Sequence, residues 1–375
     1  MQVAASDPPR FEVPRGFLLA PAGLCLLAGL AGAMQLAGLP TPLDVDRLED
    51  VHGMVLVLGF LGTLIALERA VALRQPLGYG APVLLGLSGI ALVISPLNVR
   101  IGQVGLVLGT AALTALWRRR HDVEVLVQVL AAGLATVAAI LWLGVDVEAF
   151  IPWLSAFIVL IIAGERVELA RITMNQRTAQ VILVLACFLA AALIASLLWP
   201  SAGTRAFGAV LLVLVAWLAR YDVARRMVRA HGLPRFSATA ILLGYGWLSV
   251  AAITWLTFGV ADTTAGYDVT IHAVFLGFAM SMVMAHAPII LPAVLRRPLP
   301  YSRWSWLPLV LLHLGLIVRL AIGDVVDPEG RVWEVGAALT ITALVLFVVV
   351  SAALSVHSSL TTGNKHATPR GNSPS

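Results

Sequence analysis

Near-continuous apolar runs of about twenty residues recur along the whole of this 375-residue chain. A run of that length crosses the hydrocarbon of a bilayer as an α-helix, whereas a membrane β-strand needs about ten residues that alternate in polarity. Hydrophobic residues make up 59% of the chain and charged residues 12%, which leaves too little polar surface for a soluble protein of this size. The sequence therefore predicts an all-α integral membrane protein, embedded in the lipid bilayer.

Charged residues and breaks containing Pro or Gly divide the chain into twelve such runs, each predicted to be one transmembrane helix. The first run follows a segment at 1–15 and is too long for a signal-peptide core, so we interpret it as a retained helix. The transmembrane domain then covers 16–357, and the polar residues 358–375 are predicted to form a disordered tail. The runs lie at 16–39, 51–73, 79–97, 100–117, 124–144, 151–173, 178–199, 204–222, 236–259, 267–293, 304–323 and 333–356.

Arginines gather in alternate connections between the predicted helices, whereas most acidic loop residues occupy the other connections. By the positive-inside rule, this asymmetry predicts a multi-pass protein of the cytoplasmic (inner) membrane with both the N- and C-termini in the cytoplasm. Two cytoplasmic termini require an even number of spans, and the independent count of twelve satisfies that requirement. No basic stripe is interleaved with aromatic residues, so nucleic acid is not a predicted partner.

The second, sixth and tenth predicted helices share a short pattern centred on a phenylalanine. They read LGFLGTLIALERAV, SAFIVLIIAGERVE and LGFAMSMVMAHAPI, with Phe60, Phe157 and Phe278 in register. The pattern recurs every four helices. It predicts three four-helix units, arranged as arcs about a pseudo-threefold axis.

Two histidines stand at the outer ends of the second and tenth predicted helices. Because both helices run from outside to inside, His52 and His272 lie at matching depth, where two imidazoles can hold one heme iron from both sides. Imidazole nitrogen also suits copper, so the metal is left open. Any heme is non-covalent because the chain has no CxxCH motif, which makes heme b the predicted cofactor. The alternative is a pair of interfacial histidines wetted by the headgroup region.

A third histidine, His286, lies fourteen residues after His272 on the same predicted helix. On a regular α-helix this spacing gives about 21 Å of rise and about 40° of rotation, so both are predicted to face one groove. A second cofactor site there needs a partner, and His313 is the candidate on depth. The alternative is that Pro288 and Pro292 kink the helix and His286 satisfies the freed carbonyls.

Charged residues also occupy the inner third of the second and sixth predicted helices. Adjacent side chains on a helix splay about 100° apart, so pairing across helices is expected rather than pairing within each Glu-Arg dipeptide. Two interpretations are open, a structural ion-pair lattice and a proton path toward a buried centre. The residues are Glu68, Arg69, Glu165, Arg166 and Glu168.

Arginines on the side of the two outer histidines are candidates for binding heme propionates. Arg319 is embedded in an apolar run, and Arg331 starts the next predicted helix. A guanidinium pairs well with a carboxylate, so both are predicted to neutralise propionates. The alternative for Arg319 is snorkelling to the outer headgroups.

Twelve helices with histidines on the second and tenth are similar to the catalytic subunits of heme-copper oxidases and nitric oxide reductases. The resemblance implies that His52 and His272 are the low-spin heme ligands, but the copper or iron ligands expected on the sixth and seventh helices are missing. The segments HGMVLVLGF and IHAVFLGF resemble the NnrS family more closely. That family consists of twelve-helix heme and copper proteins linked to nitric oxide metabolism and resistance to nitrosative stress.

Together these features predict a heme-binding membrane protein linked to nitric oxide, respiratory or metal metabolism, with an electron-transfer or respiratory protein as partner. Whether it is also an oxidoreductase is left open. A cofactor-free secondary transporter is one alternative, although carriers with twelve helices usually show a six-plus-six symmetry. A factor that passes heme or copper to another complex is the other.

Overall fold

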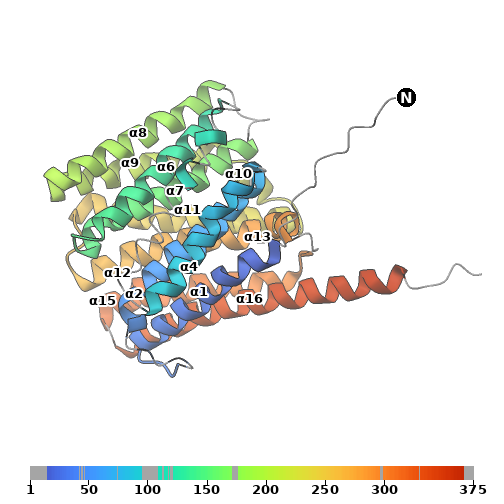
Figure 1. The fold of residues 1–375 in the computed structure, drawn as a ribbon. Helices are drawn as coiled ribbons and strands as arrows, with labels where there is room; N and C mark the ends of the chain where they lie inside the picture. Colours follow the sequence, from blue (N-terminus) through green and yellow to red (C-terminus); the bar gives the residue numbers. More distant parts are fainter. Residues whose placement is uncertain are drawn as a thin grey trace, which may run out of the picture.

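The computed structural model describes residues 15–94, 109–118, 121–170, 176–295 and 299–366, except positions 42, 44, 46, 74, 112, 113, 117 and 329. Helices with roughly parallel axes lie side by side, with α8 and α9 at one edge and α16 at the opposite edge (Figure 1). The described residues contain helices, turns and loops but no strand, which confirms the predicted all-α class.

The helical elements follow one another along the chain without intervening domains. They are α1 (Arg15–Leu36), α2 (Arg47–Met54), η1 (Val55–Gly62), α3 (Thr63–Leu73), η2 (Pro76–Tyr79), α4 (Gly80–Ile94), α6 (Val123–Leu141), α7 (Val147–Ala170), α8 (Gln176–Leu198), α9 (Pro200–Tyr221), α10 (Ala224–Met227), α11 (Leu233–Phe258), α12 (Thr264–His272), η4 (Ala273–Met280), α13 (Ser281–Leu295), η5 (Arg303–Ser305), α14 (Trp306–Leu316), η6 (Ile317–Gly323), α15 (Asp324–Val326) and α16 (Arg331–His366).

Within the described residues, eleven helical stretches are long and apolar enough to cross a membrane. In order along the chain they correspond to eleven of the twelve predicted spans, since span length and apolarity are local properties of the sequence. The remaining predicted span, 100–117, lies largely outside the described residues. The chain is therefore an α-helical multi-pass membrane protein, and the count of twelve stays a prediction.

The outer helices expose large apolar side chains, whereas one helix is enclosed by the others. Phe188 on α8 and Val349 on α16 are more than half exposed, on helices at the two edges of the bundle (Figure 1). In contrast, every residue of α7 from 150 to 164 is buried. Exposed apolar side chains on the edge helices suit contact with lipid, and α7 is the central helix of the bundle.

Neighbouring helices in the sequence are mostly neighbours in space. Helix α1 packs against α2, η1 and α4; α6 packs against α7, and α8 against α9; α11 packs against η4 and α13, and α14 against α16. Contacts between α9 and α11 and between α1 and α16 join these groups. Spans 2 and 10 therefore lie inside the bundle together with α7.

Three π-helical segments, η1, η4 and η6, interrupt the described spans 2, 10 and 11. Both η1 and η4 contain the LGF sequence that these two spans share, whereas α7 is an uninterrupted α-helix. A π-turn closes hydrogen bonds between residues i and i+5, so the side chains beyond it are rotated relative to a regular α-helix, and such turns are frequent at functional sites.

Small residues allow η1 to approach its neighbours closely. A Cβ atom on Gly59 would lie 2.8 Å from Sγ of Cys25 on α1 and 3.0 Å from Cα of Gly89 on α4. Both distances are too short for an ordinary Cβ contact, so glycine is required for this three-helix packing.

The last helix continues past the end of the predicted span. Helix α16 extends beyond position 356 to His366 and runs past its neighbours at one end of the bundle (Figure 1). The predicted boundary between transmembrane domain and tail at 357/358 therefore does not coincide with the end of the helix. Residues 367–375 and the predicted N-terminal segment before Arg15 lie outside the described residues.

Candidate functional site

The structure brings His52 of α2 and His272 of α12 together at one end of the bundle, which we call the histidine end. His52 lies within electrostatic range of His272, Asp268 and Arg319. Labels α2, α12 and α15 gather at this end in Figure 1. The two histidines thus lie at the same end of the bundle, and their shared ligation of a heme stays a prediction.

Each of these histidines is anchored through its Nδ1 atom. Nδ1 of His52 lies 2.8 Å from the carbonyl oxygen of Glu49, and Nδ1 of His272 lies 3.0 Å from the carbonyl oxygen of Asp268. A carbonyl oxygen only accepts, so Nδ1 donates and the lone pair is on Nε2. Among the described residues neither Nε2 atom has a hydrogen-bond partner, which leaves both free to coordinate a metal.

The Asp268 carboxylate contacts the Nδ1 side of the His272 ring. Oδ1 of Asp268 lies 2.8 Å from Nδ1 of His272 and accepts from Arg319 at 2.6 Å, while Oδ2 accepts from Nε of Arg319 at 2.8 Å. Trp333 donates its indole N–H to Oδ2 at 3.1 Å, and its ring lies 4.3 Å from the guanidinium. The Asp268 carboxylate is thus held by three partners, and Asp324 of α15 also interacts with it.

The predicted propionate ligands have different surroundings. The Arg319 side chain is only 11% exposed and binds Asp268 through two of its nitrogens, so it does not snorkel to the headgroups. Arg331 is exposed at the start of α16, at the same end of the bundle. A role for either arginine toward a propionate stays a prediction, and the contacts place Arg319 behind His272.

The residues at the histidine end offer two imidazole ligands, the number that a heme needs from the protein. No group of three or more His, Cys, Asp or Glu side chains that could hold an ion occurs in the part of the chain described. A heme needs only two axial ligands because the porphyrin supplies four nitrogens. Beside His52, a Cβ added to Gly53 would meet no atom within 4 Å, so this side of α2 borders open space.

His286 and His313 have separate partners and do not form the predicted second cofactor site. Nδ1 of His286 donates to the Met282 carbonyl at 2.7 Å, and its Nε2 accepts from Arg166 at 3.1 Å. Since both ring nitrogens are engaged, His286 is not available as a ligand. The expectation that it shares a groove with His272 assumed a regular α-helix, whereas the π-helical segment η4 lies between the two.

His313 belongs to a different polar group in the middle of the bundle. Trp247 donates to its Nδ1 at 2.9 Å, so Nε2 carries the proton and faces Oγ of Ser281 at 3.4 Å. Ser281 in turn donates to the carbonyl of Gly277 in η4 at 2.6 Å. A Cβ on Gly277 would lie 2.4 Å from the Trp247 ring, so this glycine makes room for the indole.

His286 joins a buried network at the opposite end of the bundle, which we call the glutamate end. Arg166 of α7 donates to both oxygens of Asp222 at 2.6 and 2.8 Å, as well as to His286. Tyr245 donates to Oδ2 of Asp222 at 2.6 Å, and the backbone N–H of Ala224 donates to Oδ1 at 2.8 Å. Every polar atom of the Asp222 carboxylate is therefore satisfied.

These bonds set the protonation of Asp222, which lies just beyond the end of α9. Burial acts to raise the pKa of this carboxyl, but the hydrogen bonds and charge of Arg166, with the Ala224 and Tyr245 donors, outweigh it and the pKa is lowered. Sequence reasoning missed Asp222. It is the one acidic residue between Arg220 and Arg235, and that charge pattern could have identified it.

Arg69 is the centre of a second cluster at the glutamate end. Its NH2 atom donates to Oε1 of Glu68 at 2.5 Å and to Oε1 of Glu165 at 2.9 Å. Its NH1 atom donates to Oε1 of Gln128 on α6 at 3.2 Å and lies 3.5 Å from Oε2 of Glu168. Four polar side chains from three spans thus surround one guanidinium.

This cluster corrects the prediction about the two Glu-Arg dipeptides. Glu68 and Arg69 do pair with each other, because both side chains turn toward Glu165 on the neighbouring span. Glu165 and Arg166 splay apart as predicted, and bind Arg69 and Asp222 respectively. The two clusters are also neighbours, because α13, which carries His286, contacts α3, which carries Glu68.

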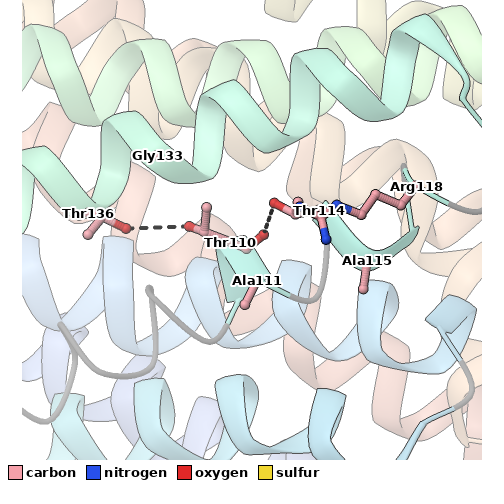
Figure 2. Close-up of a pocket in the computed structure, with 7 residues that line it drawn as sticks. All are labelled: Thr110, Ala111, Thr114, Ala115, Arg118, Gly133 and Thr136. Atoms are coloured by element: carbon pink, nitrogen blue, oxygen red, sulfur yellow. Dashed lines mark hydrogen bonds between the residues drawn. The ribbon is translucent and has the colours of Figure 1, made fainter.

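A pocket of about 740 Å³ lies elsewhere, between residues 109–118 and α6. Figure 2 shows Thr110 and Thr136 facing each other across it, 3.5 Å apart. Thr114 and Thr136 also donate to backbone carbonyls one turn earlier in their own helices. None of the predicted site residues lines this pocket, whose walls are Thr110, Ala111, Thr114, Ala115, Arg118, Gly133 and Thr136.

The protein is therefore an α-helical multi-pass membrane protein with two histidines at one end of the bundle and buried charged clusters at the other. Residues 15–356 match the model of DUF8744, described as a domain of unknown function, and the chain belongs to that family. Comparisons with curated proteins and with solved structures give no match.

Proposed function

We propose that this protein binds one heme b between His52 and His272 and acts in electron transfer or in handling a diatomic gas such as nitric oxide. The observation that carries the proposal is the pair of imidazoles at the histidine end, with anchored Nδ1 atoms and available Nε2 atoms. The resemblance of HGMVLVLGF and IHAVFLGF to the NnrS family supports the link to nitric oxide. A heme held by two histidines would supply one-electron transfer, and a gas would bind its iron only after displacing one of the histidines.

The side chains around His272 prepare it as a ligand. Asp268 accepts a hydrogen bond from the Nδ1–H group of His272. This bond fixes the tautomer and makes Nε2 more basic, as carboxylates that bind metal-bound histidines do. Arg319 and Trp333 hold Asp268 in place and compensate its charge. His52 has only a backbone carbonyl behind it, so the two proposed ligands differ in basicity.

The proposed chemistry is narrower than that of the oxidases. The sixth and seventh spans, which include α7 and α8, contain no histidine to build a copper or non-heme iron centre beside the heme. Electron transfer with a respiratory partner protein, or gas binding in exchange for one of the two histidines, therefore suits these residues better than reduction of oxygen at a binuclear centre.

The proposed topology has twelve spans in three four-helix units. The protein lies in the cytoplasmic (inner) membrane, with both termini in the cytoplasm. The arginine distribution supports this orientation. Packing of α1 with α2 and α4, of α6 with α7, and of α11 with α13 lies within these units, whereas the packing of α9 with α11 joins two of them. In this orientation the histidine end faces outward and the glutamate end faces the cytoplasm.

An absorption spectrum of the full-length protein purified in detergent tests the proposal. We expect a reduced α-band of heme b after dithionite, lost in His52→Ala and in His272→Ala but kept in His231→Ala, which changes an exposed loop histidine. A colourless protein without iron or copper would refute it. That result would favour a cofactor-free transporter, and copper without heme would favour a metal-delivery factor.

A further inference from the structure

The Glu68 and Glu165 carboxylates both contact the same nitrogen atom of Arg69 at the glutamate end. Their Oε1 atoms lie 2.5 and 2.9 Å from the same NH2 atom of Arg69, so the two oxygens are separated by at most the sum of these distances. Two carboxyl groups at such a separation cannot both ionise without strong repulsion.

The charges around this pair do not balance if every carboxyl is ionised. Among the described residues, Glu68 and Glu165 both bind the single positive charge of Arg69. The next cation, Arg166, is already paired with the Asp222 carboxylate. Uncompensated buried charge is costly, so one carboxyl of the cluster keeps its proton.

A titration of this pair is governed by groups from every neighbouring element. Arg69 lies on α3 beside Glu68, Glu168 and Arg166 lie on α7 beside Glu165, and His286 lies on α13, which contacts α3. On α6, Gln128 binds Arg69, and the buried Glu124 precedes it by one turn. Since His286 accepts from Arg166, it is uncharged and contributes no compensating cation.

Two buried donors in the cluster lack an acceptor. Nε of Arg69 and Nε2 of Gln128 have no hydrogen-bond partner, and Gln128 is fully buried with its Oε1 bound to Arg69. Buried donors of this kind are normally satisfied by an internal water, which needs a polar site with several partners. The unpartnered amide thus points to a water molecule at the acid pair.

Exposure decreases stepwise from the surface of the cluster toward its interior. The side chains of Glu168, Glu68 and Glu165 are 33%, 27% and 12% exposed. His286, which lies on α13, is 8% exposed. The order gives a proton a route inward from the glutamate end, through Glu68 to Glu165.

We propose that Glu68 and Glu165 form a proton-binding site that holds one exchangeable proton, with a water bound between Arg69 and Gln128. Transfer within the site breaks the O–H bond of one carboxylic acid and forms an O–H bond on the other carboxylate, so the net charge of the pair is unchanged. The bound water relays the proton. This proposal does not depend on the heme, because none of its residues contacts His52 or His272.

Infrared spectroscopy of the full-length protein in detergent tests the site directly. We expect a protonated-carboxyl stretching band at neutral pH that shifts in D₂O, and loss of part of its intensity in Glu68→Gln and in Glu165→Gln. Glu168→Gln is the matched control, which lies farther from Arg69 and should retain the band. An unchanged band in both pair variants overturns the proposal.

Acid–base titration of the purified protein provides a second, independent measurement. Wild type should release one more proton than Glu68→Gln as the pH is raised from neutral through the alkaline range. Equal proton counts for properly folded wild type and variant contradict the site. If the variants do not fold, D₂O exchange of the wild-type band still decides, because a carboxylic acid band that is absent at neutral pH rules out a held proton.

Discussion

The two ends of this bundle bury charge in opposite ways. At the histidine end the Asp268 carboxylate is enclosed by donors, and the Nε2 atoms of the two histidines and Oδ2 of Asp324 have no hydrogen-bond partner among the described residues. At the glutamate end two carboxylates share one guanidinium, and Nε of Arg69 and Nε2 of Gln128 are buried donors without an acceptor among the described residues. Unused acceptors suit a metal, whereas unused donors beside crowded acids suit water and a proton.

The strongest disruption of the glutamate end should come from Arg166→Met. The substitution leaves the Asp222 carboxylate buried without its bidentate partner, and breaking such a pair costs about 3–5 kcal/mol. Thermal unfolding in detergent should show a large loss of stability. The matched change Arg220→Met at the end of α9, where the side chain is more exposed, should have little effect. Equal effects would contradict the importance of the Arg166 network.

At the histidine end, Asp268→Asn should weaken heme binding about 10–100-fold, the usual cost of removing a partner behind a metal-bound histidine. The amide cannot accept from Arg319 and from His272 as the carboxylate does. Heme titration of the apoprotein measures the effect. Asp262→Asn in the preceding exposed loop is the control, and similar affinities for the two variants would argue against the support of His272 by Asp268.

A steric change can separate the two ends without altering charge. In Gly164→Ala the new Cβ lies 2.8 Å from Cγ of Gln128 and 3.0 Å from the Glu124 carbonyl, so α6 must shift. Overpacking of this kind costs about 1–3 kcal/mol. We expect a lower melting temperature with unchanged heme spectra. Gly133→Ala on α6, where the new Cβ meets nothing within 4 Å, should be tolerated.

The smallest effect concerns acid stability. Because the pKa of Asp222 is lowered in the folded protein, its ionised form contributes stability at and above its unfolded pKa, and this contribution is lost as the pH falls through the folded pKa. Melting temperatures recorded from neutral pH into the acid range should therefore fall less steeply in Asp222→Asn than in wild type. Parallel curves would show that Asp222 does not contribute to acid stability.

The spans could be predicted from the sequence because length and apolarity are local, but the partners of the polar side chains could not. Asp268 stands four residues before His272, a helical spacing that the sequence displays, yet its clamp by Arg319 and Trp333 depends on how α12 packs on η6 and α16. Gln128 is a lone amide in an apolar run, and nothing local indicates that it meets Arg69.

The rotational position of side chains around the tenth span also could not be predicted from the sequence. The calculation that placed His286 on the same face as His272 holds for 3.6 residues per turn, and η4 interrupts that period between them. The register of Phe60 with Phe278 in η1 and η4 was visible, but the sequence did not indicate that both segments adopt π-turns while α7 remains α-helical.

Helix α7 presents consecutive residues to different neighbours, with Glu165 toward α3 and Arg166 toward α9 and α13. Because both residues are held by hydrogen bonds on different sides, α7 cannot rotate about its axis without straining the bonds on both sides. A rearrangement of one set of bonds would therefore displace the other set, because both belong to the backbone of one buried helix.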